Sequence, residues 1–199
     1  VSHELKGPLS SSMMSANALR QEIVGPLNET QKRCVAIICR SLDYATMMIR
    51  NYLDLSRIEQ NELRINPIRF NLRERVLHPV TLDMEPAIQS KKMNLEIGVP
   101  TDFELTADPD LMRVVFQNLI GNAIKYGKEG GKIRIWSQDA GEKWAIHVWN
   151  EGVGVPADKL DVLFRKFGRV QDPRLTAERG TGLGLFITRD ILRLHGGEI

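Results

Sequence analysis

Three glycines at alternate positions stand near the end of the chain, in the segment Arg179-Gly180-Thr181-Gly182-Leu183-Gly184-Leu185. Glycine tolerates positive φ and lets the backbone come close to a ligand. The segment runs into an amphipathic helical pattern, and the start of a helix presents unpaired N–H groups and the positive end of its dipole. Phosphate oxygens suit such a position. The spacing therefore indicates a phosphate-binding helix start.

Polar side chains recur along one face of an earlier helical pattern. Asn118 and Asn122 are four residues apart and Lys125 follows three residues later, so a helix places all three side chains on one face. Carboxamide oxygens suit Mg²⁺, a hard ion that is often shared with substrate phosphates. The pattern favours a nucleotide site, and a solvated polar face is the alternative.

Length and composition bound the class of protein that carries these groups. The 199 residues suit one large or two small domains, and 42% hydrophobic and 26% charged residues are ordinary for a globular protein. A net charge of +2 argues neither for nor against nucleic acid or a membrane as a partner. The sequence contains no apolar run as long as a membrane span and no signal peptide. We expect a soluble chain.

The first part of the chain has the pattern of a helical hairpin. Residues 1–24 carry an apolar stripe, Gly25-Pro26 interrupts it, and Asn28 to Gln31 has the form of a capping box. The apolar seam of the second helix consists of Val35, Ile38, Leu42, Ala45, Ile49 and Tyr52. This strict alternation of three and four is typical of a bundle. Two helices alone cannot bury two such stripes, so we expect a hairpin that dimerises into a four-helix bundle.

Two cysteines lie inside the second helical pattern. Cys34 and Cys39 are five residues apart, which fits neither a disulfide framework nor a zinc site. We expect buried free thiols in a reducing compartment.

Strands and helices alternate after a polar linker at residues 58–67. The patterns predict strands at 69–72, 94–99, 132–136 and 144–149, and helices at 73–90, 108–126, 156–167 and from the glycine segment to position 195. Residues 168–179 show no periodicity, and the last residues have the form of a turn entering a strand. These elements predict an α/β sandwich with one helical layer.

The order of motifs along the chain resembles the catalytic core of sensor histidine kinases. It is His-Glu-x-x-x-Pro, Asn-x-x-x-Asn, Gly-x-Gly, Phe-x-x-Phe and Gly-x-Gly-x-Gly, and it spans essentially the whole chain. The resemblance implies a dimerisation and phosphotransfer hairpin of the HisKA type over residues 1–66. It also implies an ATP-binding domain of the GHKL type over residues 67–199, with further strands expected beyond the last residue.

In this resemblance His3 is the phosphoacceptor and Glu4 is the general base. A neutral imidazole nitrogen is nucleophilic near physiological pH, and the carboxylate would hold or remove the proton of the other ring nitrogen. Pro8 cannot donate a hydrogen bond to the carbonyl of Glu4, so we expect the helix to kink close to His3. An ordinary surface histidine is the alternative, and the nucleotide motifs downstream argue against it.

The resemblance assigns ATP binding to residues from five segments of the second domain, with Mg²⁺ on Asn118. They are Asn118, Asn122, Lys125, Tyr126, Asn150, Gly152, Gly154, Phe164, Phe167, Arg174, Arg179, Gly180, Thr181, Gly182, Leu183 and Gly184. For Tyr126, Phe164 and Phe167 a plain core role is the alternative, and Arg174 and Arg179 are equally well explained as solvated side chains on a lid.

Asn150 departs from the family pattern, which usually has Asp at this position to accept a hydrogen bond from the adenine amine. An amide oxygen still accepts that bond, but without the charge that strengthens it. We expect the substitution to affect adenine affinity rather than remove the site.

These features predict a protein-histidine kinase that uses ATP and Mg²⁺, phosphorylates itself on His3 and passes the phosphoryl group to a response regulator. The expected partners are a second copy of the chain and a receiver domain, without nucleic acid. The expected location is the bacterial cytosol, with any membrane attachment through upstream segments. The rivals are an ATP-binding pseudokinase or scaffold and a GHKL ATPase that drives dimer clamping.

Overall fold

The computed structural model describes residues 2–59, 64–170 and 180–199. The chain forms two compact units, residues 1–62 and residues 63–199. The first unit is helical and the second contains both strands and helices. Within the described residues, no helix combines the length and the apolar character needed to cross a membrane.

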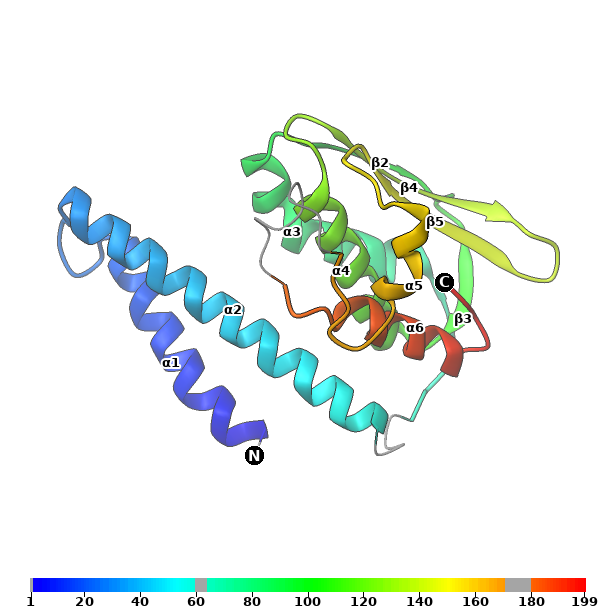
Figure 1. The fold of residues 1–199 in the computed structure, drawn as a ribbon, viewed down its shortest axis with the longest axis horizontal. Helices are drawn as coiled ribbons and strands as arrows, with labels where there is room; N and C mark the ends of the chain where they lie inside the picture. Colours follow the sequence, from blue (N-terminus) through cyan, green and yellow to red (C-terminus); the bar gives the residue numbers. More distant parts are fainter. Residues whose placement is uncertain (1, 60–63, 171–179) are drawn as a thin grey trace. The chain divides into compact units, whose positions relative to one another are not determined.

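The first unit is a hairpin of helix α1 (Ser2–Arg20) and helix α2 (Glu29–Glu59), which lie side by side in Figure 1. A small cluster of Ala16, Val35 and Cys39 is buried between them. Leu19, Leu27 and Leu42 pack against this cluster. The hairpin predicted from the two apolar stripes is therefore confirmed.

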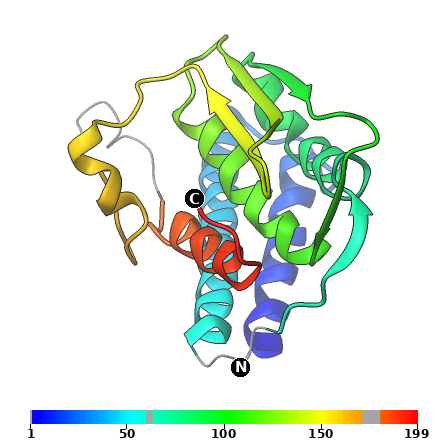
Figure 2. The same ribbon diagram turned by 90° about the vertical axis from the view of Figure 1, so that its right-hand side faces the viewer.

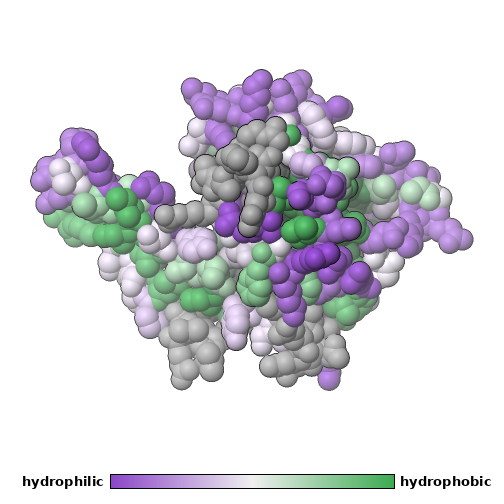
Figure 3. Space-filling model, in the orientation of Figure 1, coloured by the Kyte–Doolittle hydropathy of each residue, from purple (hydrophilic) through white to green (hydrophobic). Residues whose placement is uncertain are grey.

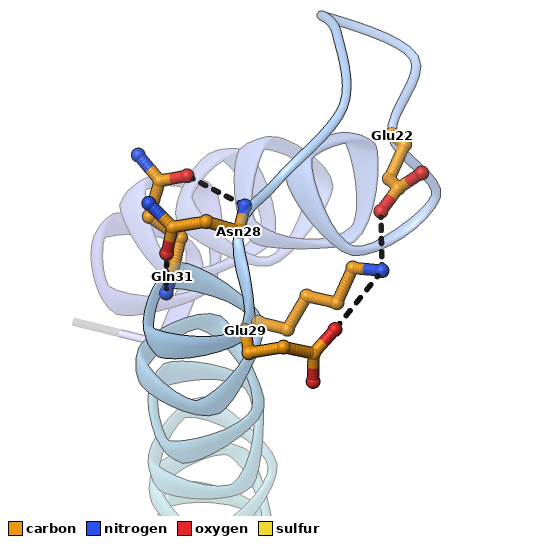
Figure 4. A network of polar contacts seen from close by, with 5 residues as sticks. Glu22, Asn28, Glu29 and Gln31 are labelled. Atoms are coloured by element: carbon orange, nitrogen blue, oxygen red, sulfur yellow. Dashed lines mark hydrogen bonds and ion pairs between the residues drawn. The ribbon is translucent and has the colours of Figure 1, made fainter.

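The turn of the hairpin is fixed by a reciprocal pair of hydrogen bonds, drawn in Figure 4. The N–H of Asn28 donates to Oε1 of Gln31, and the N–H of Gln31 donates to Oδ1 of Asn28, both at 2.9 Å. This is the predicted capping box. Lys32 also pairs with Glu22 at 3.1 Å, and this hydrogen bond and charge lower the pKa of Glu22. The first helix ends at Arg20, four residues before the predicted end, because Glu22 takes a φ of 56°.

Much of the hairpin's apolar surface is not covered within one chain. Ile38 and Tyr52 of the predicted seam are 47% and 67% exposed, whereas Val35 of the same seam is buried against α1. A groove of about 680 Å³ also lies along the hairpin, and its lining includes Met13 and Ile49. Figure 3 shows apolar residues at this surface.

Helix α2 also corrects two expectations. It continues through Glu59, so the first two residues of the predicted linker are helical. Cys39 is buried as expected, but Cys34 is exposed, because the helix turns its side chain away from α1. Both thiols are free.

The second unit begins with β1 (Ile68–Asn71), the π-helical turn η1 (Arg73–Leu77), α3 (His78–Ser90), β2 (Asn94–Gly98) and β3 (Glu104–Ala107). It continues with α4 (Pro109–Tyr126), β4 (Lys132–Asp139), β5 (Trp144–Asn150), the 3₁₀ turn η2 (Ala157–Lys159), α5 (Leu160–Leu163) and α6 (Gly184–Leu194).

The strands form two small sheets. In one, β1 pairs antiparallel with β3, with Phe70 opposite Leu105. In the other, the order is β2-β4-β5, with β2 parallel to β4 and β4 antiparallel to β5. Ile135 lies opposite Val148 in the antiparallel pair. The predicted β4–β5 hairpin is therefore present.

Helices cover one side of the three-stranded sheet, as Figures 1 and 2 show together. Helix α4 packs against α3, α6 and β5 and lies at the centre of this layer. Alternation along β4 turns Ile133 and Ile135 into the core with no exposed area, while Arg134 between them is exposed. The predicted sandwich with one helical layer is confirmed.

Three element predictions were wrong or incomplete. The strand β3 was not predicted, although its four residues Glu104–Ala107 alternate in burial. The helix predicted over 156–167 is reduced to η2 and α5, which end at Leu163. Residues 197–199 form no strand in the described structure.

Candidate functional site

The start of α4 is anchored by the carboxylate of Asp108. Its Oδ1 accepts the N–H groups of Asp110 and Leu111 at 3.0 and 3.2 Å, and its Oδ2 accepts the N–H of Asn66 at 2.9 Å. Burial acts to raise the pKa of this carboxyl, but the three N–H donors outweigh it and hold the pKa below its usual value. The N–H of Asp108 donates to Nε2 of His195 at 3.0 Å. Helix α4 is thereby tied to the residue that follows α6.

Midway along α4, the half-buried side chain of Asn118 meets the start of α6. Its Nδ2 donates to the carbonyl oxygen of Gly184 at 3.2 Å and to Oγ1 of the fully buried Thr188 at 3.4 Å. A β-carbon at position 184 would lie 3.0 Å from Oδ1 of Asn118, a tight contact that a larger residue could make only if the Asn118 side chain moved. Because the carbonyl can only accept, the amide nitrogen faces α6 and the oxygen keeps its lone pairs for another partner.

At the other end of α4, Lys125 and Tyr126 border the glycine segment. The ammonium of Lys125 lies over the Tyr126 ring, 4.7 Å from its centre. A β-carbon at Gly180 would lie 2.6 Å from this ammonium and 4.0 Å from the Tyr126 hydroxyl. Asn122 is half-buried one helical turn before Tyr126. Both side chains next to Gly180 are half-buried.

The end of α4 also meets the end of β5. Gly127 and Gly152 form an isolated antiparallel bridge. A β-carbon at position 152 would lie 2.5 Å from the carbonyl oxygen of Tyr126 and 2.7 Å from Nδ2 of Asn150. The structure therefore brings the half-buried Asn150 next to Gly152 and Tyr126.

The two phenylalanines differ in their surroundings. Phe164 follows α5 and is half-buried, whereas Phe167 is 64% exposed and takes a φ of 59°. The alternative of a core residue is therefore wrong for Phe167. Gly182, with a φ of 71°, packs against the backbone of Phe167, where a β-carbon would lie 2.6 Å from its carbonyl carbon. Gly154 is exposed and has a φ of 72°.

The glycine segment leads directly into α6, as the sequence predicted. Oγ1 of Thr181 accepts the N–H of Leu183 at 3.1 Å, and Leu183 is the N-cap residue, after which α6 begins at Gly184. The Leu183 side chain is 2% exposed, so this residue belongs to the core by its side chain and can reach a ligand only through its backbone.

Four predicted residues cannot be placed by their side chains. The backbone of His3 and Glu4 belongs to α1. Arg174 and Arg179 lie outside the described residues.

The donor set around Asn118 fits a magnesium ion that is shared with phosphates. Mg²⁺ prefers oxygen ligands and keeps several waters, so one carboxamide oxygen beside the start of α6 suits it. Among the described residues there is no group of three or more His, Cys, Asp and Glu that could hold a metal by itself.

Sequence reasoning missed two residues that support this site. Thr188 holds Asn118 in place, but on an amphipathic helix it has the appearance of a small core residue. Lys91 donates to the last carbonyls of α4, but it stands next to Lys92 in a turn and has no local signal. Both act across at least 33 residues of sequence, so only the folded chain reveals them.

Two family models match the chain. Residues 1–61 match the His Kinase A (phospho-acceptor) domain, and residues 107–199 match the histidine kinase-, DNA gyrase B- and HSP90-like ATPase. Both confirm the resemblance seen in the order of motifs.

Individual proteins agree with the family models. The circadian input-output histidine kinase CikA of Synechococcus elongatus is 31% identical over 208 residues, which cover 100% of this chain and 27% of that protein. The chain thus spans about a quarter of the length of this relative. The catalytic domain of the histidine kinase ThkA is 31% identical with a TM-score of 0.55, covering 64% of this chain and 80% of that structure. Full-length ShkA, solved in complex with AMPPNP, shares the fold with a TM-score of 0.72 at 24% identity, covering 98% of this chain and 40% of that one.

A phosphoacceptor hairpin joined to an ATPase-type α/β domain defines the catalytic core of sensor histidine kinases. The chain belongs to this family of protein-histidine kinases. The comparisons give no support to the ATP-binding pseudokinase.

Proposed function

We propose that this chain binds ATP in the 63–199 unit, transfers the γ-phosphoryl group to His3, and passes it to an aspartate of a response regulator. The observation that carries the proposal is the convergence around α4 of Asn118, Lys125 and Tyr126 with the segment Gly180–Gly184 and with Gly152. These residues come from distant parts of the sequence and supply an amide oxygen, a cation and a helix start at one place.

Each of these groups has a distinct part in binding the nucleotide. The N–H groups at the start of α6 and the ammonium of Lys125 offset the charge of the phosphates. Asn150 accepts the adenine amine through its amide oxygen, while Gly152 and Gly154 let the base approach the backbone. Asn122 and Tyr126 border the phosphates and the ribose. Phe164 and Phe167 flank residues 168–179, the proposed lid. From this lid Arg174 and Arg179 reach phosphate oxygens. The remaining members of the proposed set are Thr181, Gly182 and Leu183.

Asn118 is the residue that would hold Mg²⁺. When bound, Mg²⁺ neutralises phosphate charge and favours departure of ADP. Positioning and charge neutralisation carry most of the catalysis of phosphoryl transfer, so the protein itself needs few reacting groups.

The acceptor chemistry belongs to the hairpin. A ring nitrogen of neutral His3 forms a bond to the γ-phosphorus as the bond from that phosphorus to the bridging oxygen of ADP breaks. Glu4 holds the N–H of the other ring nitrogen in place and then takes its proton, so that the phosphorylated ring ends neutral. The aspartate of a receiver domain then attacks the same phosphorus and frees His3.

The division of labour follows the two units. We assign dimerisation and phosphotransfer to residues 1–66 and ATP binding to residues 67–199. The exposed seam residues Ile38 and Tyr52 support a homodimer, in which two hairpins form a four-helix bundle. ATP and receiver domains are cytosolic, so we propose that this core works in the bacterial cytosol.

Incubation of the chain with γ-labelled ATP tests the proposal against its rivals. A histidine kinase acquires an acid-labile, base-stable label on the protein, and His3→Gln loses it while still binding ATP. A GHKL ATPase releases free phosphate without labelling the protein, and that outcome would overturn the proposal.

A further inference from the structure

The last turn of α4 leaves backbone carbonyls that have no partner within the helix. The ammonium of Lys91 satisfies two of them. Its Nζ donates to the carbonyl oxygen of Ile124 at 2.8 Å and to that of Lys125 at 2.7 Å. A cation at this end of a helix also interacts favourably with the negative end of the helix dipole.

The backbone of Lys91 holds the same region from a second direction. Its carbonyl oxygen accepts the N–H of Gly130 at 3.0 Å, and its own N–H closes α3 on Ala87. Lys91, the residue that follows α3, therefore holds the chain on both sides of Gly127. Its side chain binds the carbonyls before Gly127, and its backbone carbonyl binds the N–H of Gly130 after it. Gly127 itself forms the bridge to Gly152.

The last turn of α4 carries two of the residues that border the glycine segment. The carbonyl oxygen of Lys125 accepts a hydrogen bond from Lys91, and its own ammonium lies against Gly180. Tyr126 follows it, and the Tyr126 carbonyl oxygen packs closely against Gly152. A shift of this turn would therefore move both side chains relative to the start of α6.

We propose that Lys91 is a positioning residue for ATP, which fixes the last turn of α4 so that Lys125 and Tyr126 are held ready for the nucleotide. This inference rests on the proposed function, because it takes these two residues as nucleotide contacts. The Lys91 ammonium is bonded to helix carbonyls, so it acts on binding through Lys125 and Tyr126 rather than on the reacting atoms.

The neighbouring lysine provides a matched control. The Lys92 side chain is 78% exposed, and its ion pair with the exposed Glu129 spans 3.7 Å. Lys91→Met and Lys92→Met remove the same charge from adjacent positions, but only Lys91→Met removes the two bonds to α4. Lys91→Arg keeps the charge and offers two donors to the same two carbonyls.

The experiment measures autophosphorylation of the whole chain against ATP concentration, together with ATP binding at a temperature where every variant is folded. Lys91→Met is expected to raise the KM and the Kd for ATP about ten-fold, since it removes two charge-assisted bonds. Its kcat is expected to stay within about two-fold. Lys91→Arg is expected to restore most of the affinity, and Lys92→Met to match the wild type.

Wild-type affinity in folded Lys91→Met would overturn the inference and leave the proposed function intact. A fall in kcat at unchanged KM, or an equal loss of affinity in Lys92→Met, would also overturn it. If Lys91→Met does not fold, Lys91→Gln is measured instead, and it must show a raised KM relative to Lys91→Arg for the inference to stand. Failure of the wild-type chain to bind ATP would refute the proposed function itself.

Discussion

The hairpin and the ATP-binding unit cover their apolar side chains to very different extents. In the 63–199 unit, Ile120, Ile133 and Ile187 are fully buried. In the hairpin, Met14 and Tyr52 are 73% and 67% exposed. Leaving a large apolar side chain in water forgoes about 1.5–3 kcal/mol of burial free energy. The second unit therefore buries an extensive core of its own, while the hairpin buries only a small cluster and leaves apolar surface that the proposed four-helix bundle would cover.

The largest expected effect comes from placing charges on the apolar surface of the hairpin. Leu42 and Ile49 are half-buried and seven residues apart on α2, and Ile49 also lines the groove. Changing both to Asp places two charges at positions that need apolar neighbours, so we expect monomers or an unfolded hairpin. Sedimentation velocity and far-UV circular dichroism measure this.

The control for this change is Arg33→Asp with Arg40→Asp, two exposed positions with the same seven-residue spacing on α2. This variant is expected to remain folded and dimeric. A Leu42→Asp, Ile49→Asp chain that sediments as a fully folded dimer would refute the four-helix bundle.

The next effect tests the close packing of the ATP-binding unit. Gly182→Ala places a β-carbon 2.6 Å and 2.8 Å from the backbone of Phe167 and 2.9 Å from the carbonyl oxygen of Gly168, at a φ of 71°. Backbone atoms cannot move aside as a side-chain end can, so we expect the start of α6 to shift and ATP affinity to fall at least about ten-fold. Isothermal titration calorimetry with an ATP analogue measures the loss.

Gly196→Ala is the matched control, because its φ is also 71°, nothing lies within 4 Å of the new β-carbon, and the residue is outside the proposed nucleotide site. It should cost only the backbone strain, about 1 kcal/mol of stability. If both variants lose affinity equally, the strain rather than the contact with Phe167 is responsible.

The smallest effect concerns the base of the nucleotide. Asn150→Asp restores a charged acceptor beside Gly152, and a charge-assisted hydrogen bond is roughly twice as strong as a neutral one. We expect ATP affinity to stay unchanged or rise a few-fold, as measured by calorimetry. Loss of ATP binding in this variant would show that Asn150 does not face the adenine amine.

Local signals account for the parts of the structure that the sequence predicted well. The capping box of Asn28 and Gln31 lies within four residues and needs no tertiary contact. The N-cap of α4 at Asp108 and the helix start after the glycine segment are equally local. The alternating core of β4 follows from the alternation of polar and apolar residues at 132–135, which is visible in the sequence.

Predictions failed where distant contacts determine the structure. Strand β3 is held by its pairing with β1, about 35 residues earlier, and its own alternation of polar and apolar residues is only four residues long. The helix expected over 156–167 ends at Leu163, and the segment turns so that Gly168 meets the carbonyl of Val162. The support of Asn118 by Thr188 and of α4 by Lys91 joins segments that the sequence keeps apart.

Among the described histidines, the structure gives reasons why none outside the hairpin suits phosphoryl transfer. Both ring nitrogens of His195 are engaged, with the N–H of Asp108 and with the carbonyl of Ile191 at 2.8 Å. Nε2 of His147 is buried, and its ring stacks on Trp136 with the ring centres 4.6 Å apart. His78 is exposed, but it begins α3 without a carboxylate next to it in sequence.

Mapping the phosphorylated residue tests the central claim most directly. The chain is incubated with ATP and Mg²⁺, digested under neutral or basic conditions, and analysed by mass spectrometry with fragmentation that preserves the phosphoramidate. We predict a phosphoryl group on His3 that is absent from His3→Gln. A phosphoryl group on His78, His147 or His195 in the wild-type chain, or undiminished labelling of His3→Gln, would contradict the assignment of His3 as the phosphoacceptor.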